Sequence, residues 1–436
     1  MECPVSEKIR SWKYPGSTRP KQAQKEKWLN KNNKKPGNAF KQASDIRGAG
    51  NLALDAVTGI TDLVEALHHK ILSLGGILGR PDQTRTTGIT GMVYRNIRTV
   101  STAAGNSIDL LLKQFSSLLG EKCSSPEREV VLAALNGVLG DHLAAGNNPL
   151  SIPMQFRRKG VPITVGDQAF EQDLRQSNGK IALMVHGSCM NDLQWNSRGH
   201  DHGAALAHDL GYLPVYLHYN TGLHISQNGL NFSDLIQVLI DQLPEPTELV
   251  IIAHSMGGLV SRSACHYGKI AGHSWLDQLQ KIIFLGTPHH GAPLERAGNK
   301  IDILLEISPY SAPFSRLGKI RSAGITDLRY GNILEEDWKG RDRFSSGDQR
   351  KPVPLPAGVQ CYTIAAATGK PLGRLGDPLI GDGLVTVNSA LGRHKNTDRT
   401  LLFPETHQWI VRDMNHMDLL NQPEVYETLK RWLEDR

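Results

Sequence analysis

The chain has 436 residues, five cysteines, 39% hydrophobic residues and a formal net charge of +6 at pH 7. Residues 1–45 hold eleven lysines and arginines against four acids, or +7, and the remainder, with 38 basic and 39 acidic residues, carries −1. The positive excess therefore belongs to an N-terminal tail, which excludes a basic body built to bind nucleic acid.

The cysteines are widely separated, odd in number and form no C-x-x-C pair, which indicates free thiols in a reducing compartment. The N-terminus has no apolar run typical of a signal segment, and no stretch is as long and apolar as a transmembrane helix requires. These features predict a soluble, cytoplasmic protein. No pattern in the sequence specifies an oligomeric state.

The N-terminal third divides into two parts. Residues 1–45 are rich in Lys, Asn and Gln and predict solvated disorder, with contact to an anionic lipid surface as the alternative. Residues 46–150 predict an N-terminal helical region of three helices with apolar stripes, the third starting at Ser125 as N-cap and Pro126 at the first helical position. We expect this region to pack on the following domain, with a substrate channel or a lipid surface as alternatives.

From residue 151 to 436 strands and helices alternate, which predicts a mostly parallel central sheet with helices on both faces. Strands are expected at 154–165 (one or two short ones), 181–185, 214–219, 249–253, 281–285, 360–365 and 408–411. Helices are expected at 203–210 with Asp201 as N-cap, after a loop at 220–229 as far as 243, and at 423–433.

An insertion at about 292–358 interrupts this domain. It is far longer than the few residues that such a connection needs. It contains an amphipathic piece at 301–307, a second helical piece around 319–328 and a polar stretch at 339–352. Long insertions that follow a strand of such a sheet usually lie above the active site. We therefore predict that residues 292–358 form a helical lid or cap.

A sharp strand-to-helix turn is predicted after the apolar run at 249–253, where the letters H-S-M-G-G lead into a helix. Such a turn lifts a serine hydroxyl out of the packed backbone, and its crowding requires small residues two positions away. Ala253 and Gly257 meet this requirement, although alanine departs from the usual G-x-S-x-G. Ser255 is therefore the candidate nucleophile, with a serine that merely caps the helix as the alternative.

A nucleophilic serine needs a histidine base and an acid that orients it, and in this type of domain they follow in the order acid, then histidine. Asp382 lies between two glycines in a loop after the strand at 360–365, and Asp377 is its competitor. His416 follows the last strand. In this scheme His416 takes the Ser255 proton and returns it to the leaving group, while Asp382 fixes the imidazole tautomer.

The oxyanion formed on the substrate needs two backbone N–H donors. Met256, directly after the nucleophile, is one candidate. The second is expected in the His-Gly-Ser turn after the strand at 181–185, where Ser188 is preferred over Gly187. The positive end of the dipole of the helix that follows Ser255 would further stabilise the negative charge of the oxyanion.

The letters H-D-H at 200–202, with His208 and Asp209 nearby, invite comparison with a metal site. Capping of a helix by Asp201 explains them more simply, and no glycine-rich phosphate loop is present. The sequence therefore predicts no metal and no cofactor.

Five motifs in this order carry a resemblance to a known family: V-H-G at 185–187, A-H-S-M-G-G at 253–258, G-T-P-H-H-G at 286–291, G-D-G-L-V at 381–385 and N-H at 415–416. Together they resemble the lipase/esterase branch of the α/β-hydrolase superfamily, and in particular the catalytic domain of the GPI inositol-deacylases. The resemblance covers about residues 180–435. It implies an α/β-hydrolase fold, hydrolysis of carboxylic esters through an acyl-enzyme, and no cofactor.

The leading hypothesis is a serine carboxylic-ester hydrolase, an esterase or lipase, acting on small-molecule or lipid acyl esters and extending to aliphatic polyesters. An acyltransferase or thioesterase with the same three residues is the nearest alternative. The second alternative is a non-catalytic lipid-binding protein built on this fold. The intact set of Ser255, Asp382 and His416 argues against that last reading.

Overall fold

The computed structural model describes residues 126–163, 168–243, 248–292, 322–341, 348–368 and 381–435. The predicted tail, the first two predicted helices, the amphipathic piece of the insertion and the competing acid Asp377 lie outside these ranges. Within them, no helix combines the length and the apolar character needed to cross a membrane.

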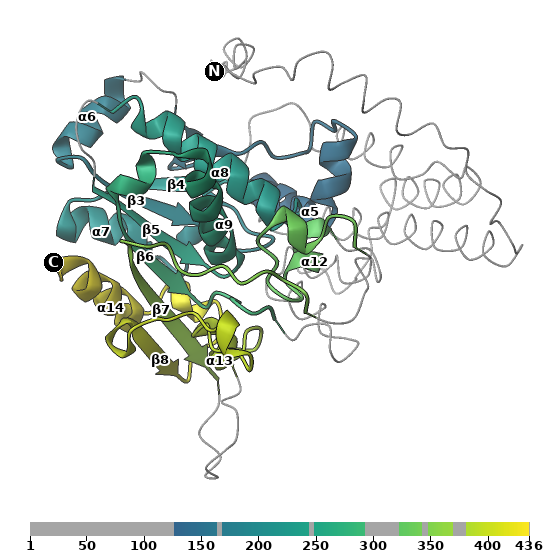
Figure 1. Cartoon of the computed structure of the whole chain (residues 1–436). Coiled ribbons are helices and arrows are strands. Elements are labelled where there is room, and N and C mark those ends of the chain that lie inside the picture. The colour runs from purple at the N-terminus through teal and green to yellow at the C-terminus, as the bar shows by residue number, and fades with distance from the viewer. Residues whose placement is uncertain are drawn as a thin grey trace, which may run out of the picture.

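The described residues form one eight-stranded sheet, in the order β2-β1-β4-β3-β5-β6-β7-β8 (Figure 1). β1 pairs antiparallel with β2 and β4, and the other pairings are parallel. The strands are β1 (Gln155–Arg158), β2 (Val161–Pro162), β3 (Lys180–Val185), β4 (Leu213–His218), β5 (Glu248–His254), β6 (Leu279–Leu285), β7 (Gln360–Ala367) and β8 (Gln408–Arg412). The mostly parallel sheet expected from the sequence is confirmed.

Both faces of the sheet are buried, which explains why its central strands are apolar throughout instead of alternating. In β3, Ile181, Leu183 and Val185 join a core on one face, while Ala182 and Met184 join a separate core on the other. All five side chains are fully buried. The continuous apolar run in the sequence therefore encodes a strand at the centre of the sheet.

Helices cover the two faces as layers (Figure 1). Side chains of α5, α8 and α9 enter one core, and those of α7 and α14 enter the other. The described helices are α5 (Pro126–Ala145), α6 (Gln168–Gln176), α7 (His202–Leu210), α8 (Ile225–Ile240), α9 (Met256–Ala271), α10 (Trp275–Gln278), α12 (Ala323–Asp327), α13 (Val387–Ala390) and α14 (Pro423–Glu434). As predicted, Asp201 caps α7, accepting a bond from the Ala204 N–H.

α8 begins at Ile225, so the predicted loop over 220–229 is confirmed only for residues 220–224 and is wrong for residues 225–229. The residue at its N-cap position, His224, makes no side-chain cap bond; the Ile225 N–H is instead accepted by Asp327, at 2.9 Å. Gly229 lies inside this helix, where glycine allows close packing on α9: a Cβ there would be 2.2 Å from the Ser263 hydroxyl oxygen. The signals for this helix are thus tertiary contacts, which a local pattern does not contain.

α5, the third helix of the predicted N-terminal helical region, starts at Pro126 as expected but is buried all round, with residues 131–140 all buried. It shares its core with the sheet. Gly140 allows close contact, since a Cβ there would lie 1.9 Å from the Asn220 side chain. An apolar stripe on one face, as predicted, therefore understates how deeply α5 is inserted.

The described second half of the insertion is docked onto the helices instead of standing apart from them. Asp327, at the end of α12, is 1% exposed and accepts bonds from the Ile225 N–H and, at 2.9 Å, from the His224 ring. Gly324 packs against the backbone at Thr221, where a Cβ would meet the carbonyl oxygen at 2.1 Å. This half is built into the domain, whereas the amphipathic half lies outside the described residues.

Candidate active site

Ser255 lies between the end of β5 and the start of α9. Its backbone has φ 55° and ψ −124°, a region that a residue with a side chain rarely occupies. A strained conformation of this kind costs about 1–3 kcal/mol and persists only where the surroundings enforce it. Its N–H donates to the carbonyl of Leu285 on β6, at 2.8 Å, which fixes the turn to the neighbouring strand.

Glycines make this turn sterically possible. A Cβ at Gly257 would lie 2.4 Å from the Val185 carbonyl oxygen, and one at Gly258 would lie 2.1 Å from the Thr287 hydroxyl. Ala253, two residues before the serine, is fully buried at the end of β5. Small residues therefore stand on both sides of Ser255, as its spacing in the sequence predicted.

The structure brings Asp382 and His416 together from loops 34 residues apart. The Nδ1 of His416 lies 2.6 Å from Oδ2 of Asp382, and the His416 N–H donates to the Asp382 carbonyl at 3.1 Å. Both side chains are buried. The bond places the ring proton on Nδ1, which leaves Nε2 with its lone pair free.

Asp382 is held in a tight turn that points its carboxylate at the histidine. Its second oxygen, Oδ1, accepts the N–H groups of Leu384 at 2.9 Å and Val385 at 2.8 Å. Gly383 has φ +98°, and a Cβ at Gly381 would overlap the Val385 carbonyl oxygen at 1.6 Å. The two flanking glycines are therefore needed for the turn that positions this acid.

Two residues that support His416 were not assigned a role from the sequence. The His254 ring lies 4.7 Å from that of His416, and its Nε2 donates to the His416 carbonyl at 3.2 Å. Gly286 has φ +59°, and a Cβ there would stand 3.1 Å from the His416 ring. Gly286 is the first residue of the G-T-P-H-H-G motif. Its role could have been predicted from the sequence, because a glycine directly after a strand often marks the close approach of a neighbouring group.

The two candidate oxyanion donors flank the serine. Met256 opens α9, where the first N–H groups have no partner within the helix. Ser188 follows Gly187, whose position is packed so tightly that a Cβ there would be 3.0 Å from the Cβ of Ser255. Within the described ranges, no hydrogen bond engages the Ser188 N–H, while the next N–H, of Cys189, donates to Thr221.

The site is nearly closed to solvent, since Ser255 is 6% and His416 4% exposed. The Nε2 of His416 is buried and has no hydrogen-bond partner in the part of the chain that the structure describes. A base and nucleophile are often not yet in hydrogen-bond contact before substrate binds. Within the described residues no hydrogen bond joins Ser255 to His416, but an unpaired imidazole nitrogen can accept a proton from a serine hydroxyl once substrate binding brings the two together.

The H-D-H residues do not face a common point. His200 Nε2 lies 2.8 Å from His202 Nδ1, and His202 Nε2 contacts the Leu419 carbonyl at 2.9 Å. Asp201 caps α7 and accepts the Tyr216 hydroxyl at 2.7 Å. No metal-binding cluster of His, Cys, Asp or Glu occurs among the residues with described positions.

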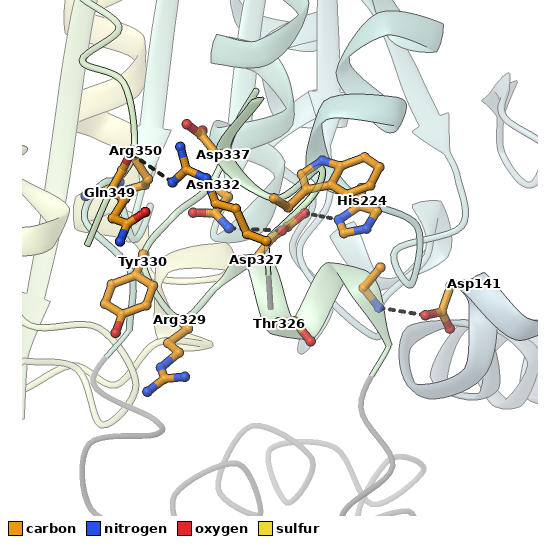
Figure 2. A pocket seen from close by; sticks show the side chains of 13 residues that line it. Asp141, His224, Thr326, Asp327, Arg329, Tyr330, Asn332, Asp337, Gln349 and Arg350 are labelled. Atoms are coloured by element: carbon orange, nitrogen blue, oxygen red, sulfur yellow. Dashed lines mark hydrogen bonds and ion pairs between the residues drawn. The ribbon is translucent and has the colours of Figure 1, made fainter. Parts of the chain in front are cut away.

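A pocket of about 280 Å³ opens between α5, α12 and the start of α8 (Figure 2). The His224 ring is stacked on Trp338 with 3.6 Å between ring centres, and Asp327 holds its Nδ1. Asp141 joins the pocket from α5 and accepts the Ala323 N–H at 2.9 Å. None of the five predicted site residues lines this pocket, so it is separate from Ser255.

An eight-stranded, mostly parallel sheet with helices on both faces, carrying a serine on a strained turn at the carboxyl end of a central strand, defines an α/β-hydrolase fold. The family model of the PGAP1-like alpha/beta domain matches residues 176–364. The match confirms the resemblance over the first three motifs, while the G-D-G-L-V and N-H motifs lie beyond its end. No curated protein sequence matches the chain significantly.

Solved structures similar to this chain include several lipases and esterases. The mature lipase BlEst2 of Bacillus licheniformis is 15% identical, with 64% of this chain and 98% of that one covered and a TM-score of 0.39. A lipase-esterase related protein of Clostridium acetobutylicum is 15% identical over 58% and 94%, with a TM-score of 0.33. A metagenomic carboxyl esterase is 15% identical over 70% and 91%, with a TM-score of 0.34.

Five histidines near the site and in the core are held neutral by burial. Removal from water lowers the pKa of His186 to about 3 and that of His202 and His290 to about 4. It lowers the pKa of His254 and His289 well below the usual value. These side chains therefore resist protonation in the folded chain at pH values where the unfolded chain would accept it.

We expect the free energy of unfolding to fall as the pH drops below about 6.5, the pKa of an unfolded histidine. Because the folded-state pKa values are lowered, the unfolded chain binds more protons, and stability is lost progressively toward the folded values. Each histidine adds a slope of up to about 1.4 kcal/mol per pH unit. Urea unfolding at about pH 7.5, 6 and 5 measures this loss.

The substitution His202→Gln should make this pH dependence less steep, because it removes one of the neutral buried rings. His208→Gln is the matched control, since the His208 side chain on the same helix is 88% exposed. An unfolding midpoint that stays constant from about pH 7.5 to 5 would contradict the expectation.

Proposed function

We propose that this chain is a serine carboxylic-ester hydrolase, an esterase or lipase, that works through an acyl-enzyme. The observation that carries the proposal is the Asp382–His416 pair at 2.6 Å, in which the His416 Nε2 is buried and has no partner among the described residues. The ring of His254, the residue directly before the strained Ser255, lies 4.7 Å from the His416 ring. Strain at a serine is expected where it presents a nucleophile. A protein that only binds lipid would have no use for it.

The proposed reaction has two halves. In the first, His416 Nε2 takes the Ser255 proton while Oγ attacks the ester carbonyl carbon, and the N–H groups of Met256 and Ser188 stabilise the oxyanion. The tetrahedral intermediate then expels the alcohol, which receives its proton from His416. In the second half, water repeats these steps on the acyl-enzyme and releases the carboxylic acid.

The proposed substrates are small-molecule or lipid acyl esters, including aliphatic polyesters, and the reaction as written needs no cofactor. An acyltransferase or thioesterase would use the same three residues and differ only in what attacks the acyl-enzyme. The two are distinguished by whether a thiol or alcohol acceptor accelerates the second half of the reaction more than water does.

Pre-steady-state hydrolysis of p-nitrophenyl esters, from acetate to palmitate, tests this proposal. We expect a burst of nitrophenol equal to the enzyme concentration, because nitrophenol leaves readily and deacylation should then be slower than acylation. The chain length with the highest kcat/KM would separate an esterase from a lipase. Folded protein that turns over none of these esters, with or without an added acceptor, would contradict the proposed activity.

A further inference from the structure

A small pocket of about 20 Å³ is lined by residues of α9, of the loop that contains G-T-P-H-H-G and of the segment between residues 331 and 353. Arg262 contributes from α9, His289 and His290 come from that loop, and the segment up to residue 353 closes it. Its volume is enough for one water-sized occupant. The charged and ionisable side chains that line it include Arg262, His289, His290, Arg350, Lys351 and Arg399.

The positive charges around this pocket are only partly compensated. Arg350 and Arg399 both pair with Asp348, and Lys351 pairs with Glu336 at 3.2 Å. Asp337 also lines the pocket, but its carboxylate accepts the N–H groups at positions 333, 334 and 351. None of the described carboxylates forms an ion pair with Arg262.

Arg262 is 5% exposed, and among the described residues its guanidinium makes one hydrogen bond, from Nη2 to the Val353 carbonyl at 2.6 Å. Its Nε has no partner in the part of the chain that the structure describes. Burial lowers its pKa to about 10, so it still carries its charge at neutral pH. A buried charge without a counter-charge is strongly destabilising, which indicates that something in the folded protein compensates it.

His289 presents a second unpaired donor at the same place. It is fully buried between Phe284 and Phe403, and neither ring nitrogen has a hydrogen-bond partner among the residues whose positions are described. A neutral imidazole carries one N–H in either tautomer. One buried N–H is therefore left without an acceptor, and such a group costs about 1–3 kcal/mol.

We propose that this pocket binds one monatomic anion, chloride in the cell, held by the Arg262 guanidinium and the ring N–H of His289. Both groups are donors, and the pocket they line has an excess of positive charge. Water would satisfy the hydrogen bonds but not the charge. A volume of about 20 Å³ suits one monatomic ion better than phosphate or sulfate, which favours halides over polyatomic anions.

The proposed anion would stabilise the two segments that position the catalytic residues. Arg262 lies on the helix that starts directly after Ser255, and His289 lies three residues after Gly286, which touches the His416 ring. A single ion between them would join the nucleophile helix to the loop that supports the base. Chloride would then act on the stability of the site without touching the substrate.

Two measurements on the full chain test this site. Crystals soaked in bromide should give an anomalous peak between Arg262 and His289. Thermal unfolding at equal ionic strength should give a higher midpoint in sodium chloride than in sodium gluconate, because only the smaller anion fits and it binds only the folded protein. At a chloride concentration about 100 times the Kd, the folded-to-unfolded ratio should rise by about 100-fold.

The variant Arg262→Met keeps most of the side-chain volume and removes the charge. It should abolish the difference between chloride and gluconate while retaining or raising the midpoint in gluconate. Lys351→Met is the matched control, because that side chain is 61% exposed, and it should keep the chloride effect.

A bromide-soaked crystal without a peak in this pocket would overturn the proposal and leave the pocket to water. Equal midpoints of the wild-type protein in chloride and gluconate would overturn it as well. Neither measurement depends on whether the Arg262 variant folds. Both are independent of ester hydrolysis, so a failure here would not count against the proposed activity.

Discussion

Ser255→Ala is expected to remove ester hydrolysis almost completely, lowering kcat by about 10⁵–10⁶-fold. The loss follows because the substitution deletes the atom that forms the acyl-enzyme and leaves His416 without a nucleophile to deprotonate. Folding should be unaffected. The Ser255 side chain makes no cap hydrogen bond to α9, and alanine accepts the same backbone conformation with similar strain.

The measurement is kcat for a p-nitrophenyl ester, with the circular dichroism spectrum and unfolding midpoint of each variant as proof of folding. Ser261→Ala is the matched control. Ser261 is buried on α9 six residues after Ser255, and within the described ranges its hydroxyl bonds only to the Gly257 carbonyl. Folded Ser255→Ala protein that keeps more than about a hundredth of wild-type activity would show that the nucleophile lies elsewhere.

The parts of this site that the sequence predicted are those encoded locally. The buried strand β5 reads as an unbroken apolar run, because a strand covered on both faces has no polar side. The small residues around Ser255 and the two glycines around Asp382 mark turns that only such residues allow. The order of residues in the chain then suggested Asp382 and His416 as the partners of Ser255, and the structure places these two in hydrogen-bond contact with each other.

The parts that the sequence did not predict depend on residues far apart in the chain. The first N–H of α8 is accepted by Asp327, 102 residues later, so no local cap announces where the helix begins. The His254 ring reaches the carbonyl of His416 across 162 residues. Arg262 likewise reads as an ordinary polar position on an amphipathic helix. In the structure it is buried and donates to the carbonyl of Val353, 91 residues later in the chain.

The second large effect is expected for Asp382→Asn, which should lower kcat by about 10⁴-fold. The N–H groups of Leu384 and Val385 both point at Oδ1 and would hold the amide oxygen of the asparagine there. The amide NH₂ would then face His416 Nδ1 and donate to it. This reverses the tautomer, places the ring proton on Nε2 and removes the base that Ser255 needs.

Steady-state kcat and KM for one ester, measured on Asp382→Asn and Asp377→Asn together, check this assignment. The acid acts on the reacting state, so KM should change far less than kcat in the first variant. The second variant is the control, because Asp377 is the acid that competes with Asp382 in the sequence, and it should retain wild-type kcat. The reverse result would assign the orienting role to Asp377, and the bond of 2.6 Å between Asp382 and His416 would then only brace the loop.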